Sequence, residues 1–452
     1  MTLLHRRILY IIFILLFFII TPAVLFYAAG YNFDVKNGAI ERTGILIIKT
    51  DPRGAQVHLG DKKKYNWLYT FFYGDKPLLT PLKLRNLLPD DYALVITKDG
   101  YFDYHKKITL YPGQTVVLDE VTLLKQSVPE QIVSENVIKT ALAPDKNKLA
   151  VVTDTSLIVV EANTGRLNPL PLSIAATTAD NFDIVWEQNN RKILLTLPNW
   201  PVYNLETGQK EIDIGRYFPI AGARARWSAA SDDKIFLLRN NTVYSFSVAE
   251  KKYTALFSTA GLHDFLVKDG NLYTLETRVN GSVVAIYDVN SLQAQKTISL
   301  PDARSYEFKN TREKLLYVYE PMRALLYVID PFSFAPLQSS LSDVRNFSVR
   351  DTAILYWNDF EIWSYDIVNK TNGLLTRISK PIETALLGDQ YVVYTTPTTI
   401  TGMERGDRDF VNVIDILKWQ DTSDALASLN GKYLYFVSPL NERRILWRLD
   451  IK

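Results

Sequence analysis

The chain has 452 residues, and its 51 lysines and arginines nearly balance 49 aspartates and glutamates, for a net charge of +2. This balance argues against nucleic acid as a partner, because nucleic-acid-binding proteins normally carry a basic excess on one domain. The chain has no cysteine, which excludes disulfides and a lipidated-cysteine anchor. The length predicts at least two domains, and short runs of Val, Ile, Tyr, Phe and Thr predict a mostly β protein.

The first 30 residues predict a membrane anchor. Ile8–Ala29 contains no charged residue and is long enough, as a helix, to cross a hydrocarbon core of roughly 30 Å. The basic residues His5–Arg7 precede it, and the next basic residue is Lys36. The positive-inside rule then places the N-terminus in the cytoplasm and residues 31–452 outside it. We therefore expect a single-pass cell-membrane protein with a cytoplasmic stub and signal-anchor at 1–30, contacting the lipid bilayer through residues 8–29.

A cleaved signal peptide is the alternative interpretation of this segment. Ala28-Ala29-Gly30 could serve as a cleavage site. A cut after Ala29, however, would put the bulky Tyr27 where signal peptidases prefer a small residue. This favours an uncleaved anchor and leaves cleavage open.

After a linker at 31–43, residues 44–125 alternate short strands with turn signals. This segment resembles the PEGA domain, a small β-sandwich-like module of exported prokaryotic proteins. Five motifs carry the resemblance in family order: Pro52-Arg53-Gly54-Ala55, Thr80-Pro81, Leu88-Pro89, Gly100-Tyr101 and Pro112-Gly113. Asp90, where the family usually has Gly, and an insert between Gly60 and Thr80 depart from the pattern. The family has no known enzymatic activity, so the resemblance implies binding or spacing.

The insert Asp61–Gly74 combines three lysines with six aromatic residues. Trp and Tyr rings favour the membrane–water interface, and lysines can meet anionic headgroups there. We therefore hypothesise a membrane-interface insert; the alternative is that its rings cover a sheet face or the neighbouring domain. The candidate interface residues are Lys62, Lys63, Lys64, Tyr65, Trp67, Tyr69, Phe71, Phe72 and Tyr73.

The remaining segment, 126–452, repeats itself. Each unit has an apolar or aromatic anchor, a polar turn and two or more hydrophobic strands, and successive anchors lie 38 to 43 residues apart. A β repeat of about 40 residues is typical of the four-stranded blades of a β-propeller. Eight units fit, and seven remain possible because the fourth and seventh match least well. The anchors are Ala143, Trp186, Trp227, Phe265, Phe308, Phe347, Leu386 and Ala427.

The last unit ends without an outer strand, and a spare strand-like segment, Gln131–Ser134, precedes the first unit. We predict that this segment completes the last blade, which removes the exposed edges of an open sheet. Several units close on an acid that can cap the following turn: Asp288, Asp330, Asp366, Asp415 and Asp450. The Ala143-Pro144-Asp145 turn and the Glu161–Gly165 ending resemble bacterial extracytoplasmic propellers, at the level of architecture.

The sequence carries no recognisable catalytic or metal-binding motif. It has four histidines, none spaced as metal ligands, and no nucleophile elbow or phosphate loop. We therefore expect no enzyme, cofactor or metal, and we place His263 at the surface or rim. Carboxylate pairs such as Asp232-Asp233 and Asp407-x-Asp409 are typical of solvated turns.

The longest excursion between predicted strands is Thr395–Asp409, and long loops on a rigid scaffold often carry binding surfaces. We predict that it contributes to a rim surface together with nearby tryptophans. The alternative is that these tryptophans pack between blades. The candidate rim residues are Trp200, Trp357, Asp359, Trp363, Glu404, Arg405, Asp407 and Arg408.

The sequence thus predicts an all-β protein with one N-terminal transmembrane helix, a PEGA-like sandwich and a propeller. Fold alone does not give function. The leading hypothesis is a membrane-tethered extracytoplasmic binding or scaffold protein of the cell envelope, whose propeller is a platform for a protein or a glycan. The alternative is an envelope carbohydrate-active enzyme with its site in the propeller channel. The ligand and the oligomeric state are left open.

Overall fold

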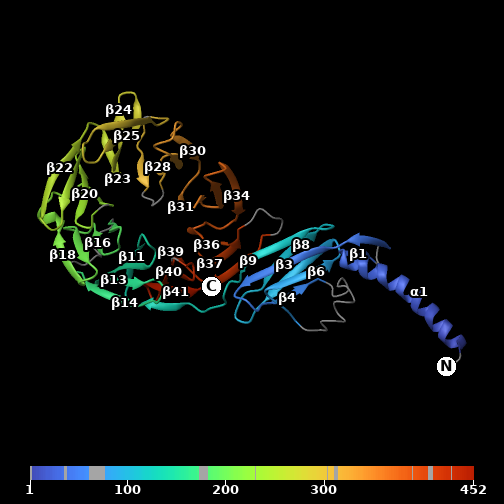
Figure 1. Ribbon diagram of the computed structural model, residues 1–452. Helices are drawn as coiled ribbons and strands as arrows, with labels where there is room; N and C mark the ends of the chain where they lie inside the picture. The colour runs from blue at the N-terminus through green and yellow to red at the C-terminus, as the bar shows by residue number, and fades with distance from the viewer. Residues whose placement is uncertain are drawn as a thin grey trace. The chain divides into compact units, whose positions relative to one another are not determined.

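The structure, a computed structural model, describes residues 3–34, 38–60, 77–172, 182–229, 231–302, 304–309, 314–388, 390–405, 411–428 and 430–452 (Figure 1). The chain divides into two compact units. The first contains Met1–Ser127, Gly402–Ile416 and Lys452, and the second contains Val128–Thr401 and Leu417–Ile451.

The first unit begins with the helix α1, Leu3–Ala28. Within the described residues, Arg6–Ala28 is the one helix long and apolar enough to cross a membrane. Its apolar side chains from Ile8 to Ile20 are exposed, as expected of a helix that has no protein core around it. The predicted N-terminal apolar helix is therefore present.

The segment 31–43, expected to be a linker, contains a β-hairpin. Strand β1, Tyr31–Asp34, pairs antiparallel with β2, Ala39–Arg42. The backbone N–H and the side-chain hydroxyl of Thr43 both donate to the carbonyl oxygen of Gly30 at 2.8 Å. These two bonds hold the end of α1 next to the start of the following sheet, so paired structure replaces an extended linker.

Two sheets then form the predicted sandwich. Their strands are β6 (Leu82–Leu87), β3 (Gly44–Asp51) and β9 (Thr115–Thr122) in one sheet, and β5 (Leu78–Leu79), β4 (Gln56–Leu59), β7 (Asp90–Thr97) and β8 (Tyr104–Leu110) in the other. β3 and β9 are parallel, and the other pairs are antiparallel. Burial alternates along β3, β7 and β8, as period-2 strands with one buried face require. The buried faces make one apolar core, which includes Leu46, Ile48, Leu94, Ile96 and Tyr104.

Two of the turn motifs bind each other across this sandwich. The Gly54 N–H donates to the Thr80 carbonyl at 2.9 Å, and the Thr80 N–H donates to the Ala55 carbonyl at 2.9 Å. The Thr80 hydroxyl also lies 2.5 Å from the Thr50 hydroxyl in a buried site. Gly54 has a φ of +77°, a conformation that glycine adopts without steric cost. The Arg-Gly-Ala and Thr-Pro segments therefore form one interlocked turn.

From residue 128 onward the described strands form eight four-stranded sheets. In chain order they are β11 (Val137–Leu142), β12 (Lys148–Thr153), β13 (Ser156–Glu161), β14 (Leu167–Pro171); β15 (Ile184–Trp186), β16 (Lys192–Leu195), β17 (Pro201–Asn204), β18 (Gln209–Asp213); β19 (Arg224–Trp227), β20 (Lys234–Arg239), β21 (Thr242–Ser247), β22 (Lys252–Ser258); β23 (Leu262–Lys268), β24 (Asn271–Arg278), β25 (Gly281–Asp288), β26 (Ala294–Ser299); β27 (Glu307–Lys309), β28 (Leu316–Glu320), β29 (Leu325–Ile329), β30 (Leu337–Leu341); β31 (Asn346–Arg350), β32 (Ala353–Trp357), β33 (Glu361–Asp366), β34 (Thr371–Arg377); β35 (Thr384–Leu387), β36 (Tyr391–Thr396), β37 (Thr399–Glu404), β38 (Val413–Lys418); and β39 (Ser423–Ala427), β40 (Tyr433–Leu440), β41 (Arg443–Asp450) with β10 (Glu130–Val133). A short 3-10 helix, Ile214–Arg216, follows β18.

The first seven of these sheets are meanders of consecutive strands, and the eighth has the order β10-β41-β40-β39. β10 pairs antiparallel with β41, so the segment before the first sheet is the outer strand of the last one. Figure 1 shows the sheets placed in succession around a ring, from green through yellow to red. This is the topology of a β-propeller with eight blades, the larger of the two predicted numbers.

Apolar side chains between neighbouring sheets hold the ring together. The strands β12, β13, β16 and β20 are almost continuously buried, because each has a sheet on both faces. The indole N–H of Trp186 donates to the Ala141 carbonyl at 3.1 Å, and that of Trp227 donates to the Val185 carbonyl at 3.0 Å. Each predicted tryptophan anchor therefore reaches back to the first strand of the preceding sheet.

Three of the predicted closing acids cap their turns as expected. Asp288 accepts hydrogen bonds from the backbone N–H of Asn290 and Ser291, and Asp366 accepts from Val368 and Asn369. Asp330 accepts from the N–H of Phe332 at 3.1 Å. Asp415, in contrast, lies inside β38 and not at the end of a third strand. The third strand of this blade is β37, whose sequence resembles a loop.

Candidate functional site

A cavity of about 1270 Å³ opens within the second unit. Its walls come from the first strands of several blades and from the loops beside them, including Leu142, Trp186, Arg224, Arg226, Glu307 and Arg350. First strands face the axis of a propeller, so this cavity is its central channel. A volume of this size is large enough to receive a segment of a protein or an oligosaccharide.

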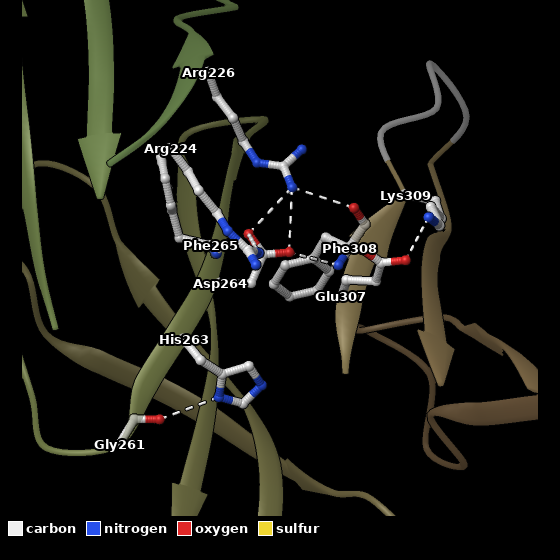
Figure 2. Close-up of polar contacts among 9 residues, drawn as sticks. All are labelled: Arg224, Arg226, Gly261, His263, Asp264, Phe265, Glu307, Phe308 and Lys309. Carbon is white, nitrogen blue, oxygen red and sulfur yellow. Dashed lines mark hydrogen bonds and ion pairs between the residues drawn. The ribbon is translucent and has the colours of Figure 1, made fainter. Parts of the chain in front are cut away.

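Asp264, on β23, is the buried centre of the polar network beside this cavity (Figure 2). Its side chain is 1% exposed. It accepts hydrogen bonds from the backbone N–H of Phe265 at 2.9 Å and of Phe308 at 2.7 Å. Nη2 of Arg226 donates to both carboxylate oxygens, at 3.2 and 3.3 Å, and to the Phe308 carbonyl at 3.2 Å. One carboxylate therefore ties together β19, β23 and β27 of three successive blades.

Arg224 carries the charge that this network presents to the cavity. It lies two residues before Arg226 on β19, so the two side chains leave the same face of the strand. Nη1 of Arg224 is 3.6 Å from Asp264 Oδ1, and its side chain remains 57% exposed. Because a single carboxylate faces two guanidinium groups, one positive charge is left over at the wall. An exposed guanidinium is suited to bidentate recognition of a carboxylate or phosphate.

Each carboxylate that lines the cavity has a basic partner. Asp183 lies 2.9 Å from Lys139, Glu307 lies 2.5 Å from Lys309, and Asp351 lies 3.9 Å from Arg350.

Basic and acidic side chains both line the cavity or pair with residues that line it. The basic residues are Lys139, Lys146, Arg224, Arg226, Lys309 and Arg350, and the acidic residues are Asp183, Asp264, Glu307 and Asp351. Among them, Arg224 shares its single acidic partner with Arg226, and this favours an anionic ligand in the cavity.

Lys309 also packs on an aromatic ring. Its Nζ lies 4.9 Å from the centre of the Tyr319 ring, within the range of a cation–π interaction. Burial, followed by the charges of Glu307 and Glu320, raises the pKa of Tyr319, so the phenol stays neutral and donates to the Val344 carbonyl at 2.8 Å. The Glu307–Lys309 pair is thereby fixed in position beside the cavity.

His263 precedes Asp264 on β23 but is separate from this network (Figure 2). Its Nδ1 lies 3.2 Å from the Gly261 carbonyl, and its buried Nε2 has no hydrogen-bond partner in the described part of the chain. The ring is half-buried, which corrects the expectation of a surface position. Over the same described ranges, no group of three or more His, Asp and Glu side chains is placed to hold a metal ion.

Comparison with known protein families identifies the sandwich. Residues 43–125 match the family model of the PEGA domain, which covers the sandwich described above. The chain is a PEGA-domain protein with a C-terminal β-propeller. No curated protein matches the sequence.

Solved structures similar to this PEGA-domain protein include other propellers. BamB from Moraxella catarrhalis is 10% identical, with a TM-score of 0.46 over 72% of this chain and 99% of that one. The Dos1 propeller is 11% identical, with a TM-score of 0.47 over 72% and 95%. Porphyromonas gingivalis dipeptidyl peptidase 4 is 11% identical, with a TM-score of 0.49 over 71% of this chain and 58% of that one. Likenesses this distant concern the fold and carry nothing about function.

Two tryptophans that we predicted to lie at the rim are buried in the propeller core. Trp200 is 7% exposed and packs in an apolar cluster with Trp227, although its edge lines the central cavity. Trp357, at the end of β32, is 3% exposed. Neither ring therefore offers an exposed rim surface, because neighbouring strands and loops cover both.

Two other rim candidates remain accessible. Asp359 is exposed and lies 2.9 Å from Arg345. Trp363 is half-buried, stacks on Tyr356 with the ring planes 12° apart, and donates from its indole N–H to Glu361 at 3.0 Å. These contacts occupy the polar groups of both residues, and neither residue lines the cavity.

The excursion Thr395–Asp409, expected to be a loop, contains the strand β37. Within the first unit, Glu404 accepts hydrogen bonds from the Tyr104 hydroxyl at 2.8 Å and from Lys106 Nζ at 2.7 Å. Glu404 is thus held in a largely buried ion pair, not presented at a rim.

Several predicted residues have little or no structural description. Arg405, directly after β37, is half-buried. Asp407 and Arg408 lie outside the described residues. The same holds for the whole candidate membrane insert, from Lys62 to Tyr73.

Sequence reasoning missed Arg224, Arg226 and Asp264. A signal was present, because Arg-Ala-Arg directly precedes the anchor Trp227. On a first strand, two arginines separated by one residue share a face, and that pattern could have marked them as neighbours in the channel wall.

Proposed function

We propose that this chain is a membrane-tethered extracytoplasmic protein of the cell envelope that binds its ligand without transforming it. In this proposal the propeller is the binding platform, and its central cavity receives the anionic group of an envelope protein or glycan. The observation that carries the proposal is the Arg224–Arg226–Asp264 network, which leaves one uncompensated positive charge on the cavity wall.

The different environments of Arg224 and Arg226 support a binding role. Arg226 and Asp264 are held by backbone groups of neighbouring blades, so their positions are set before a ligand arrives. Arg224 is 57% exposed and can turn its guanidinium toward a carboxylate or phosphate.

The arrangement of acids supports binding over glycoside hydrolysis. A glycosidase needs two carboxyl groups roughly 5 to 9.5 Å apart, one poised as acid and one as base or nucleophile. Each carboxylate that lines this cavity is instead within 4 Å of a basic side chain. We therefore propose a non-enzymatic role.

The test is binding of matched acidic and neutral probes to the full-length protein in detergent. The probes are a glucuronate-containing oligosaccharide, a neutral oligosaccharide of equal length and an oligo-glutamate peptide. We expect one of the acidic probes to bind and Arg224→Gln to weaken that binding by about 10- to 100-fold, since a hydrogen bond to a charged group contributes roughly 1.5 to 3 kcal/mol.

The matched control is Arg191→Gln. Arg191 is 56% exposed and pairs with Glu206 at 3.2 Å, so it resembles Arg224 in exposure and charge but does not line the cavity. Its variant should bind as the wild type does. Equal binding by the wild type and Arg224→Gln would contradict the cavity as the site, and cleavage of an oligosaccharide would favour the enzyme.

A further inference from the structure

The hairpin β1–β2, which directly follows the apolar helix α1, is amphipathic. Tyr31 and Arg42 lie opposite each other in the hairpin, and Ile40 lies two residues before Arg42, so the three side chains share one face. Tyr31 is 38% and Ile40 58% exposed. Asn32 and Glu41 are the next opposed pair, so polar side chains occupy the other face.

The apolar face of the hairpin lies beside the end of α1. The Tyr31 ring packs edge-to-face on Phe26, with the ring centres 6.1 Å apart, and Phe26 is itself exposed on the last turns of the helix. The two hydrogen bonds from Thr43 to Gly30 hold the second strand at the same place. In a protein anchored through α1, which ends at Ala28, this face therefore lies at the level of the lipid headgroups.

A turn of the sandwich extends this surface. The Ile45 N–H donates to the Gln114 carbonyl at 2.9 Å, which places the turn between β8 and β9 beside the start of β3. A Cβ on Gly113 would lie 3.0 Å from Cδ of Arg42, so the arginine side chain passes over this turn. Tyr111, where the turn begins, is 62% exposed. The end of the sandwich next to α1 thus presents two tyrosines, an isoleucine and an arginine.

We propose that these four residues form a collar, Tyr31, Ile40, Arg42 and Tyr111, that binds the phospholipid headgroups around α1 and holds this end of the sandwich against the membrane surface. The inference rests on the membrane tether of the proposed function. The bilayer is the occupant because Tyr31 is only three residues beyond the end of α1, so the chain itself brings the collar to the lipid.

The chemistry of the collar fits a headgroup layer. Tyrosine has an apolar ring and a polar tip, and for this reason it is enriched at membrane–water interfaces. The guanidinium group of Arg42 is suited to bidentate hydrogen bonding with a lipid phosphate. The collar therefore combines a group for the apolar side of the interface with a cation for its anionic side.

The test uses one dye-labelled cysteine at a time in the full-length protein, which has no cysteine of its own. Ile40→Cys places an environment-sensitive dye on the collar. Leu79→Cys is the matched position, because Leu79 is 50% exposed and precedes Thr80, whose hydroxyl contacts Thr50 at the far end of β3. Val279→Cys, 103% exposed on the β24–β25 turn of the propeller, gives the fluorescence lifetime of a hydrated dye in the purified protein.

The proteins are reconstituted in phosphatidylglycerol vesicles, with and without lipid that carries a nitroxide on its headgroup. We expect the nitroxide to quench the dye at position 40 and not the dye at position 79, which is roughly 20 Å away along β3. Arg42→Gln should lower the ratio of lipid-contacting to hydrated dye at position 40, obtained from the lifetimes, about fivefold. This factor corresponds to the roughly 1 kcal/mol that one basic residue contributes at an anionic surface.

Arg53→Gln is the control variant. Arg53 is an exposed arginine of the same sandwich, and it precedes Gly54, whose N–H donates to Thr80 at the opposite end from the collar. Its variant should leave the lifetime ratio at position 40 unchanged. Equal quenching at positions 40 and 79, or an equal effect of Arg42→Gln and Arg53→Gln, would overturn the inference.

Flotation of the vesicles separates a failure of the collar from a failure of the tether. Protein that floats with the vesicles while the dye at position 40 stays hydrated would keep the tether and contradict the collar. Protein that does not float would contradict both. Neither readout depends on the central cavity, so both are independent of the anion-binding test with Arg224→Gln.

Discussion

Replacing Asp264 with alanine should lower the free energy of unfolding of the propeller by about 3 to 5 kcal/mol, the usual effect of removing one partner of a buried ion pair. The change leaves Arg226, whose side chain is 21% exposed, without its counter-ion. It also removes the acceptor for the N–H groups of Phe265 and Phe308. The measurement is urea-induced unfolding of the full-length protein in detergent, followed by tryptophan fluorescence.

Two further variants separate the reasons for this loss. Asp264→Asn keeps an acceptor oxygen but loses the charge, and should fall between the wild type and the alanine variant. Asp359→Ala breaks an exposed pair with Arg345 and should change stability by at most about 1 kcal/mol. A loss for Asp264→Ala no larger than that for Asp359→Ala would show that the buried network does not hold the blades together.

Replacing Val133 with aspartate should be comparably destabilising, because it opens the ring where β10 meets β41. Val133 is 2% exposed and packs with Val137, Tyr435 and Leu446. The change removes about 1.5 to 3 kcal/mol of apolar burial and adds the larger penalty of burying a charge. We expect a lower urea midpoint and faster proteolysis at the C-terminal strand β41, which would lose its outer neighbour.

The same segment provides the control. Val128 lies five residues earlier and is 87% exposed, so Val128→Asp introduces the same charge without burying it. It should leave the urea midpoint unchanged within roughly 0.5 kcal/mol. Equal stability of the two aspartate variants would mean that β10 does not close the ring.

Most of the fold could be predicted from the repeat in the sequence. Trp186 and Trp227 lie on the first strands of their sheets and donate to the preceding blade, because a residue that packs between blades must be large and apolar at the same place in every unit. Asp288 and Asp366 cap the predicted turns, because an Asx side chain reaches only backbone groups close in sequence. Interactions of this kind are local, or recur at each repeat, and so can be read from one chain.

The candidate site could not be read in the same way. Arg226 meets Asp264 across 38 residues, and Asp264 meets Phe308 across 44, so the network exists only once three blades are assembled. Trp200 was misplaced at the rim because part of the cluster that buries it, including Trp227, comes from the next blade.

The strand β37 was missed because Thr399-Ile-Thr-Gly402 resembles a polar loop. A Cβ at Gly402 would lie 2.5 Å from Leu124 Cδ1, so close packing, not flexibility, explains this glycine.

The most direct test of the account asks on which side of the membrane the propeller lies. The variant Val279→Cys is labelled with a membrane-impermeant maleimide in intact spheroplasts and again after lysis. We predict that labelling of the membrane-bound, full-size protein is as complete before lysis as after it, because residues 31–452 would lie outside the cytoplasm. Labelling only after lysis would place the propeller in the cytoplasm and contradict an envelope-binding protein.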